Sequence, residues 1–319
     1  MATMKTLNGY GFNATELNGK TSDNYLLRTD TVANSADSQK LGGKAPKYYI
    51  QPRNLLDNSD FRNPVNQRGI TSETSISAYS HFIDRWVNQT SEARSFTLST
   101  SGIGLPLPTT ILQRIENVAE GTVLTFSIKL LDGTIATLTG TVQYASDGAW
   151  MRFASISHSF GDMYMETQQG FVNVVVYNME AVTIRWAALY EGSYTADTLP
   201  PYVPKEAHVE KANCGYRFIR IGSDMYTPIG MAQADNVTSL NCLIPLPYAI
   251  NTDAAPTITL EGIMTARSAG NYIDINKIEM NSYGEYQITV WLNGINFEVG
   301  KAYDVFLQPG AHLNISRDL

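Results

Sequence analysis

The sequence has few residues suited to disulfide bridges, metal sites or membrane insertion. Its 319 residues include only 2 cysteines and 4 histidines, and the histidines stand singly, so a disulfide framework and a zinc site are excluded. We expect Cys214 and Cys242 to be small buried thiols rather than a bridge, although one bridge remains open. No apolar run is long enough to span a bilayer, and the first twenty residues lack the apolar core of a secretory signal. We therefore expect no signal peptide, no membrane insertion and no cofactor.

Positive charge is also scarce. The chain has 23 basic against 30 acidic residues, a net charge of -7. Only residues 1–52 have a small basic excess, and no segment has the dense basic face that binding to phosphate groups requires. Nucleic acids and anionic membranes are therefore poor candidates as partners, and we expect no nucleic-acid binding. With 43% hydrophobic and 17% charged residues, the composition is that of a globular protein.

The pattern that dominates is the alternation of apolar and polar residues in short segments, which is typical of β-strands. Aromatic residues make up 10% of the chain, including 18 tyrosines, and such side chains pack well on sheets. In residues 122–144 one face of a predicted strand is apolar, the opposite face is more polar, and Asp132-Gly133 supplies a hairpin turn. The apolar residues of that face are Leu124, Phe126, Ile128 and Leu130. Similar segments without intervening helices predict an all-β protein whose residues 53–205 form an antiparallel jelly roll or β-sandwich.

The chain divides into further segments around this domain. Three prolines at positions 200, 201 and 204 exclude a central strand there, and a short helix or linker is predicted at 206–214. Alternating strands return after it, so residues 215–319 are predicted to form a second, smaller β-sandwich. Residues 1–52 are polar and repeat one pattern, Leu-x-Gly-Lys followed by four residues and then Tyr, at 17–25 and again at 41–49.

This repeat cannot fold alone, because so few apolar side chains cannot offset the entropy of ordering it. Three copies around a threefold axis would bury the apolar members against one another. We therefore predict a homotrimeric stem that buries Leu17, Tyr25, Leu41 and Tyr49. The first copy is close to a phosphate-binding loop, but Ala14 replaces its first glycine and no strand–helix pattern flanks it, so nucleotide binding is not expected.

No catalytic motif is apparent. The histidines are isolated, no Gly-x-Ser-x-Gly is present, and His158 is interpreted as a surface-loop residue. Asp162 and Glu166 could act as the paired carboxylates of a glycoside hydrolase or could simply lie on a solvated strand face, because only their separation would identify such a pair. We expect a protein that is not an enzyme.

Several aromatic residues are predicted to point outward beside polar groups, an arrangement that suits sugar binding because sugars stack on rings and hydrogen-bond to polar neighbours. Covering a neighbouring domain or subunit is the alternative role for each. Trp186 is instead predicted to lie in the core with Val182 and Ile184, and Tyr286 on the apolar face of its strand with Ile288. The candidate glycan-binding residues are Trp150, Arg152 and Tyr164 in 53–205, and Trp291, Tyr272 and Tyr283 in 215–319.

Several stretches together resemble bacteriophage tail fibres. The repeats resemble those near fibre attachment ends. The stretches "RNLLDNSDFRNPVNQRG", "LQRIENVAEGTVLTFSIKL" and "VTIRWAALYEGSYTADTLPPYVPKEAHVEKANCGYRFIRI" resemble a tail-fibre domain similar to the carbohydrate-binding jelly rolls of glycoside hydrolases. The match covers roughly residues 14–222, and residues from 214 onward resemble the terminal β domain of such fibres. No sugar-contact residue is fixed by a motif in that family, so none is carried over.

The resemblance implies a homotrimeric receptor-binding protein of the virion, from a phage or a phage-like particle. Its N-terminus would attach to other tail or baseplate proteins, and it would bind bacterial surface polysaccharide without cleaving it. Two alternatives remain: a tail-spike-like glycan depolymerase, and a structural connector without a glycan site.

Overall fold

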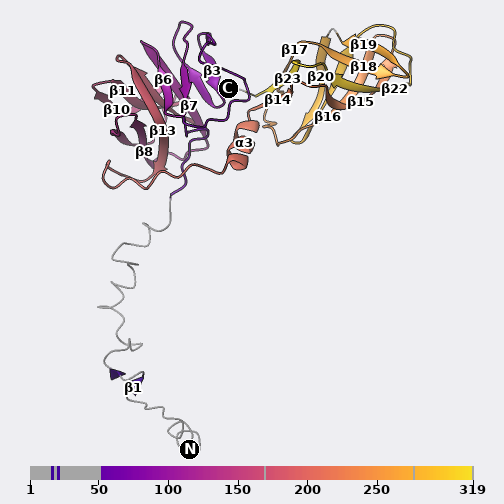
Figure 1. Ribbon diagram of the computed structural model, residues 1–319. Helices are drawn as coiled ribbons and strands as arrows, with labels where there is room; N and C mark the ends of the chain where they lie inside the picture. Colours follow the sequence, from indigo (N-terminus) through magenta and orange to yellow (C-terminus); the bar gives the residue numbers. More distant parts are fainter. Residues whose placement is uncertain (1–15, 18–19, 22–51, 169, 276, 318–319) are drawn as a thin grey trace, which may run out of the picture. The chain divides into compact units, whose positions relative to one another are not determined.

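The computed structural model describes residues 16–17, 20–21, 52–168, 170–275 and 277–317 (Figure 1). The chain separates into two compact units, residues 1–52 and 53–319. In the first unit the described strands β1 (Glu16–Leu17) and β2 (Lys20–Thr21) pair antiparallel. Three of the predicted stem residues, Tyr25, Leu41 and Tyr49, lie outside the described residues, and Leu17 is placed only as a member of β1.

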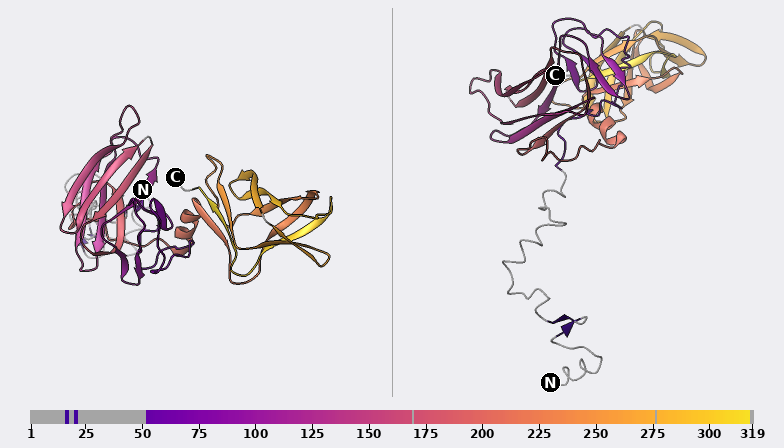
Figure 2. Two further views of the ribbon diagram at one scale, coloured as in Figure 1. Left: turned by 90° about the horizontal axis from the view of Figure 1, so that it is seen from above. Right: turned by 60° about the vertical axis from the view of Figure 1, so that its left-hand side comes forward.

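The described part of the second unit is all-β apart from one short helix, as predicted. Residues 80–191 form two antiparallel sheets of a β-sandwich (Figures 1 and 2). The six-stranded sheet has the order β10 (Met151–His158), β11 (Gly161–Gln168), β12 (Phe171–Asn178), β7 (Thr109–Glu116), β4 (Trp86–Asn88) and β3 (Ser80–Ile83). The five-stranded sheet has the order β5 (Thr97–Ser99), β6 (Gly102–Leu105), β13 (Val182–Glu191), β8 (Val123–Leu130) and β9 (Ile135–Thr141).

The core of this sandwich lies between the inner faces of the two sheets. The predicted apolar face of β8 is confirmed, since Leu124, Phe126, Ile128 and Leu130 all belong to this core. Inward-facing Met163 and Met165 of β11 meet it from the six-stranded sheet. Alternate residues of β11 therefore point away from the core, which leaves an outer face available for other roles.

Trp186 is buried but not on the predicted face. The register of β13 against β8 shifts between Ile184 and Trp186, and such a bulge turns the following side chains to the other side of the sheet. Ile184 therefore packs in the inter-sheet core, whereas Trp186 lies in a separate cluster on the outer side. There its ring stacks on Tyr202, with the ring centroids 4.7 Å apart and the planes 2° from parallel.

Residues 218–316 form two further antiparallel sheets around a second core. The three-stranded sheet has the order β14 (Phe218–Gly222), β23 (His312–Ser316) and β17 (Thr257–Glu261). The seven-stranded sheet has the order β19 (Asn271–Ile275), β18 (Met264–Ser268), β22 (Ala302–Leu307), β15 (Thr227–Asn236), β16 (Ser239–Pro245), β21 (Gln287–Asn293) and β20 (Lys277–Gly284). The predicted domain boundaries at 205 and 215 remain a prediction, because residues 53–319 form one compact unit.

The predicted short helix is α3 (Ala207–Gly215), and polar contacts attach it to the loop that precedes β3. Lys205 donates to Asp57 at 2.6 Å, Asn213 donates to the same carboxylate at 3.0 Å, and Glu210 accepts the backbone N–H of Asn58. Cys214 at the end of the helix is a free, buried thiol, as is Cys242 in β16. The prediction of two buried thiols rather than a bridge is confirmed.

Candidate functional site

The outer face of the six-stranded sheet brings together all three candidates predicted in residues 53–205. Residues directly opposite each other in an antiparallel pair point to the same face. Arg152 pairs with Glu166, Glu166 with Asn173, and Asn173 with Arg114, so these four form one row across β10, β11, β12 and β7. We name this surface the aromatic–arginine face, and its residues are Trp150, Arg152, Tyr164, Glu166, Phe171, Asn173 and Arg114.

Two arginines of the face lie against aromatic rings. The guanidinium carbon of Arg152 is 3.7 Å from the ring centroid of Tyr164. That of Arg114 is 5.7 Å from the ring of Trp150 and 5.1 Å from the ring of Phe171. Because cations are attracted to ring faces within about 6 Å, these contacts fix the directions of both arginines and of the rings beside them.

The polar members of the row are joined by hydrogen bonds. Arg114 donates through Nε to the amide oxygen of Asn173 at 3.3 Å, and the amide nitrogen of Asn173 donates to Glu166 at 3.3 Å. Asn173 is completely buried beneath this row. The chain of bonds orients the Glu166 carboxylate and leaves it free to accept further donors.

Burial changes the pKa of two members of the face. It lowers the pKa of Arg114, and the positive charge of Arg217 lowers it further, while Glu116 and Glu166 act in the opposite direction. Burial also raises the pKa of Tyr164, because the phenolate is less well solvated than the phenol. Tyr164 is therefore a neutral hydroxyl group that can donate or accept a hydrogen bond.

The face combines an accessible ring with fixed polar groups. Trp150 is 48% exposed, while Tyr164 and Phe171 are half-buried. An exposed ring covers the apolar C–H surface of a sugar, and the surrounding guanidinium, amide and carboxylate groups pair with its hydroxyls. This arrangement suits a saccharide better than a purely apolar ligand.

The two carboxylates considered for hydrolysis both lie on this side of the sheet. Asp162 and Glu166 occupy outward positions of β11 on either side of Tyr164. Asp162 accepts a hydrogen bond from the Ser157 hydroxyl at 2.6 Å, and Glu166 accepts one from Asn173. Their role as a catalytic pair stays a prediction.

The expectation for His158 was wrong. It is the last residue of β10 rather than a loop residue, and its ring stacks on Phe160 with the centroids 5.2 Å apart. Burial lowers the pKa of the imidazole. The histidine therefore serves as a packing residue at the end of an edge strand.

The three candidates in residues 215–319 do not meet. Tyr272 lies on β19 at one edge of the seven-stranded sheet, whereas Trp291 and Tyr283 lie on β21 and β20 at the other. A register shift between Met280 and Ser282 places Tyr283 opposite Ile288 on the core-facing side, so it also points away from Trp291. Trp291 is outward and 42% exposed, as predicted. Tyr286, predicted on the apolar face of β21, instead precedes that strand and is exposed.

Tyr272 lines an open hollow of about 1090 Å³ on the outer side of the seven-stranded sheet. Its rim carries the exposed side chains of Tyr226 and Met231, and the rings of Tyr226 and Tyr272 both approach the edge or face of Phe306. One wall is the ion pair between Arg267 and Asp304, 2.9 Å apart. We name this the outer hollow.

Trp291 lines a separate hollow of about 270 Å³ with four polar residues of the neighbouring strands and loops, Asp235, Asn236, Ser239 and Asn293. A single ring among polar groups is a minimal sugar-binding arrangement. It lacks the second ring and the arginines of the aromatic–arginine face.

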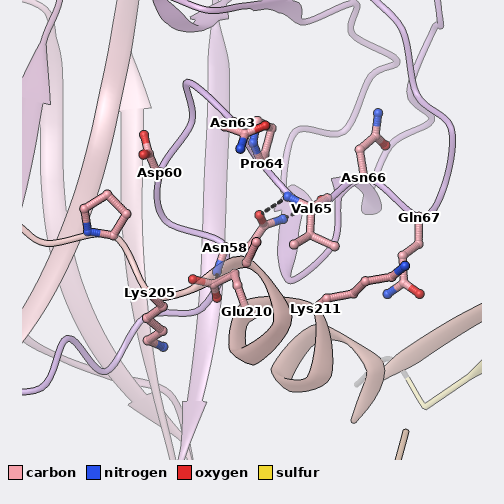
Figure 3. A pocket seen from close by; sticks show the side chains of 12 residues that line it. Asn58, Asp60, Asn63, Pro64, Val65, Asn66, Gln67, Lys205, Glu210 and Lys211 are labelled. Carbon is pink, nitrogen blue, oxygen red and sulfur yellow. Dashed lines mark hydrogen bonds between the residues drawn. The ribbon is translucent and has the colours of Figure 1, made fainter. Parts of the chain in front are cut away.

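A third hollow, of about 390 Å³, lies between α3 and the loop of residues 58–67 (Figure 3). Figure 3 shows the Asn58 side chain directed at Val65, with Glu210 of α3 nearby. The Asn58 amide donates to the Val65 carbonyl at 2.8 Å, and its oxygen accepts from the Val65 N–H at 2.6 Å. Asn58 adopts a φ of 51°, which asparagine tolerates better than most residues. Asn58 binds Val65 of the loop through its side chain and Glu210 of α3 through its backbone N–H. These polar groups therefore serve to join the loop to the helix.

Sequence reasoning missed three members of the aromatic–arginine face, Arg114, Phe171 and Asn173. Each lies in a segment recognised as a strand, and each occupies an outward position of it. The missing information was which strands are neighbours, because β7 and β12 are far apart in sequence but pair along their whole length. The alternation alone would have identified Arg114 as outward, without identifying its neighbours.

Comparison of the chain with models of protein families, with curated proteins and with solved structures finds no match. Among the described residues, no helix has the length and apolar character needed to cross a bilayer.

Proposed function

We propose that the protein is a trimeric attachment protein of the tail-fibre type that binds bacterial surface polysaccharide without cleaving it. The observation that carries this proposal is the convergence of Trp150, Arg152 and Tyr164 on one outer sheet face. The sequence predicts Trp150 and Arg152 on one outward face and Tyr164 on another strand. The strand register places Arg152 in one row with Glu166 and Arg114, and the rings of Tyr164 and Trp150 lie against Arg152 and Arg114. A jelly-roll connection of the two sheets, as in carbohydrate-binding modules, is part of this proposal.

The remaining parts of the proposal rest on the sequence resemblance. Residues 1–52 form the stem and attach to other tail or baseplate proteins, and the assembled fibre belongs to the virion. Three linked copies need only weak affinity at each site, because linkage raises the effective concentration of the others. A shallow, open face is sufficient for such a protein.

The outer hollow supports the trimer. Met231, Tyr226 and Tyr272 are 66%, 64% and 62% exposed, and exposed apolar clusters of this kind mark association surfaces. The same observation favours the structural connector as the second candidate function. Sedimentation equilibrium of the full-length protein is expected to give the mass of three chains, and the mass of one chain would contradict the trimer.

The glycan site is tested by two tryptophan substitutions in the full-length protein. Trp150 and Trp291 have similar exposed fractions, 48% and 42%, but only Trp150 belongs to the aromatic–arginine face. Trp150→Ala is expected to weaken binding to bacterial surface polysaccharides by about tenfold or more, as truncation of a central aromatic contact does. Trp291→Ala is the matched control and is expected to bind as the unmodified protein does.

Each other result of this experiment has a distinct meaning. Loss of binding with Trp291→Ala alone would move the site to residues 215–319. Release of oligosaccharide would contradict the non-enzymatic proposal, and Asp162→Asn and Glu166→Gln would then test the carboxylate pair. Failure to bind any polymer of a panel that includes the host's own would favour the structural connector.

A further inference from the structure

A small hollow at the β7 side of the aromatic–arginine face is lined by three arginines. Arg85, Arg114 and Arg217 surround a volume of about 30 Å³, and Glu116 is the one carboxylate that lines it. The volume exceeds the roughly 10–15 Å³ that a cavity needs to hold one water molecule, but it is small. It is therefore a place for one small group of a larger ligand rather than for a whole molecule.

The charges around this hollow do not balance. Arg217 forms an ion pair with Glu116, and Arg85 lies 3.4 Å from the carboxylate of Asp57. Asp57 also holds Lys205 at 2.6 Å, so it already faces two cations. Among the described residues no carboxylate lies within ion-pair distance of Arg114, whose one side-chain acceptor is the neutral amide of Asn173.

Arg114 is also held in a fixed direction. Its guanidinium carbon lies 5.7 Å from the ring centroid of Trp150 and 5.1 Å from that of Phe171, and its Nε donates to Asn173. The two terminal nitrogens make no hydrogen bond within the described residues and carry four donor hydrogens. A planar guanidinium with free donors matches a carboxylate through two parallel hydrogen bonds.

We propose that the glycan recognised by the aromatic–arginine face is acidic, with a carboxylate bound by Arg114 while the sugar ring stacks on Trp150. This inference rests on the proposed function and names its ligand class. The carboxylate is favoured over a phosphate ester because the hollow is small and a carboxylate is planar. Burial lowers the pKa of Arg114, Glu116 raises it and Arg217 lowers it. Because Glu116 already forms an ion pair with Arg217, the side-chain donors of Arg114 remain available to an incoming anion.

Glu166 does not oppose this arrangement. It lies two strands from Arg114 in the same row, with Asn173 between them. An ionised carboxylate only accepts hydrogen bonds, so Glu166 is suited to the hydroxyls of the same or the next sugar. The row therefore presents Arg114 for the acidic group of the sugar and Glu166, two strands away, as an acceptor for hydroxyl groups.

The experiment uses the full-length protein and a panel of purified bacterial capsular and O-chain polysaccharides. The panel includes polymers that contain glucuronic acid, neutral polymers and a phosphate-containing teichoic acid. Each bound uronate polymer is compared with the same polymer after its carboxyl groups have been reduced to alcohols. Dissociation constants are measured for the unmodified protein and for Arg114→Gln, Arg114→Lys and Trp150→Ala.

We expect carboxyl reduction to weaken binding by about tenfold or more, the effect of a hydrogen-bonded charge pair. Arg114→Gln should bind the acidic polymer no better than the unmodified protein binds its reduced form. Arg114→Lys should lie between them, because lysine keeps the charge and loses the paired donors. Arg53→Gln, at an exposed position, is the control for a change of one net charge and should bind unchanged.

The two proposals fail in different ways. If carboxyl reduction leaves binding unaltered, or if neutral polymers bind as tightly, and Trp150→Ala still abolishes binding, the face binds sugar and the acidic ligand is refuted. Preference for the teichoic acid over the uronates would also refute the carboxylate. If no polymer binds, or if Trp150→Ala changes nothing, the proposed function itself fails at this face.

Discussion

The stacked rings of Trp186 and Tyr202 predict that substitutions at these two positions have coupled effects on stability. The period-two pattern of β13 instead predicts Trp186 in the inter-sheet core. Trp186 is 7% exposed and lies flat against Tyr202, which belongs to the proline-containing stretch after β13. Trp186→Ala is expected to lower the free energy of unfolding by about 3–5 kcal/mol, the range for a buried aromatic. Tyr202→Ala should cost toward the lower end of that range of about 3–5 kcal/mol, since Tyr202 remains partly exposed.

The double variant separates this contact from general loss of burial. Stacked aromatic pairs contribute about 0.5–1.5 kcal/mol beyond the area they bury. The sum of the two single losses of unfolding free energy should therefore exceed the loss in the double variant by about that amount. The free energies are measured by urea unfolding followed by circular dichroism. A cycle of Trp186→Ala with Phe126→Leu is the control, because Phe126 lies in the inter-sheet core on the opposite side of the sheet.

Additivity within about 0.3 kcal/mol for Trp186 and Tyr202 would refute the stack. Coupling of Trp186 to Phe126 instead would show that no bulge turns the tryptophan outward. That result would restore the placement of Trp186 in the inter-sheet core.

Two further predictions concern stability. Gly161 has a φ of 138°, and an added Cβ would lie 2.0 Å from the Tyr177 carbonyl oxygen. Gly161→Ala should therefore lower the free energy of unfolding in urea by about 2–4 kcal/mol. The control Gly170→Ala, at a φ of 84° with open space around the Cβ, should lower it by only about 1 kcal/mol, and equal losses would contradict the predicted clash. Burial raises the pKa of Glu210 above its ordinary value of 4.5. The folded state therefore holds this proton more tightly than the unfolded state does, and it loses stability as pH rises through the raised pKa. Glu210→Gln should become more stable relative to the unmodified protein as pH rises from about 4 to 7, and a stability difference independent of pH would contradict a raised pKa.

Much of the fold could be predicted because the alternation of apolar residues survives along most strands. The inward residues of β8 and the outward position of Trp291 follow directly from a period of two. The pattern fails where one extra residue enters a strand. The bulge after Ile184 moved Trp186 to the other face, and the shift after Met280 did the same to Tyr283.

The candidate site could be predicted only residue by residue. The sequence predicts Trp150 and Tyr164 to point outward, but it does not predict that Arg114 lies beside Trp150, because strand order is a long-range property that local patterns do not encode. The stretch from 109 to 116 lies next to that from 171 to 178 only in the folded sheet. The structure therefore adds the neighbouring arginines to what the sequence alone indicated, a set of outward aromatic and polar residues suited to a sugar.

The two-residue period of β11 has an evolutionary consequence. Met163 and Met165 pack in the core between the sheets, whereas the intervening Tyr164 and its outward neighbours lie outside that core. Under the proposed function, substitutions at the outward positions would alter which sugar is preferred while the packing between the sheets is retained. Because β10 is an edge strand with a partner on one side only, it can also accept insertions near Trp150 without breaking a second ladder. The outer face of this sheet can thus change in small steps, each compatible with a folded protein.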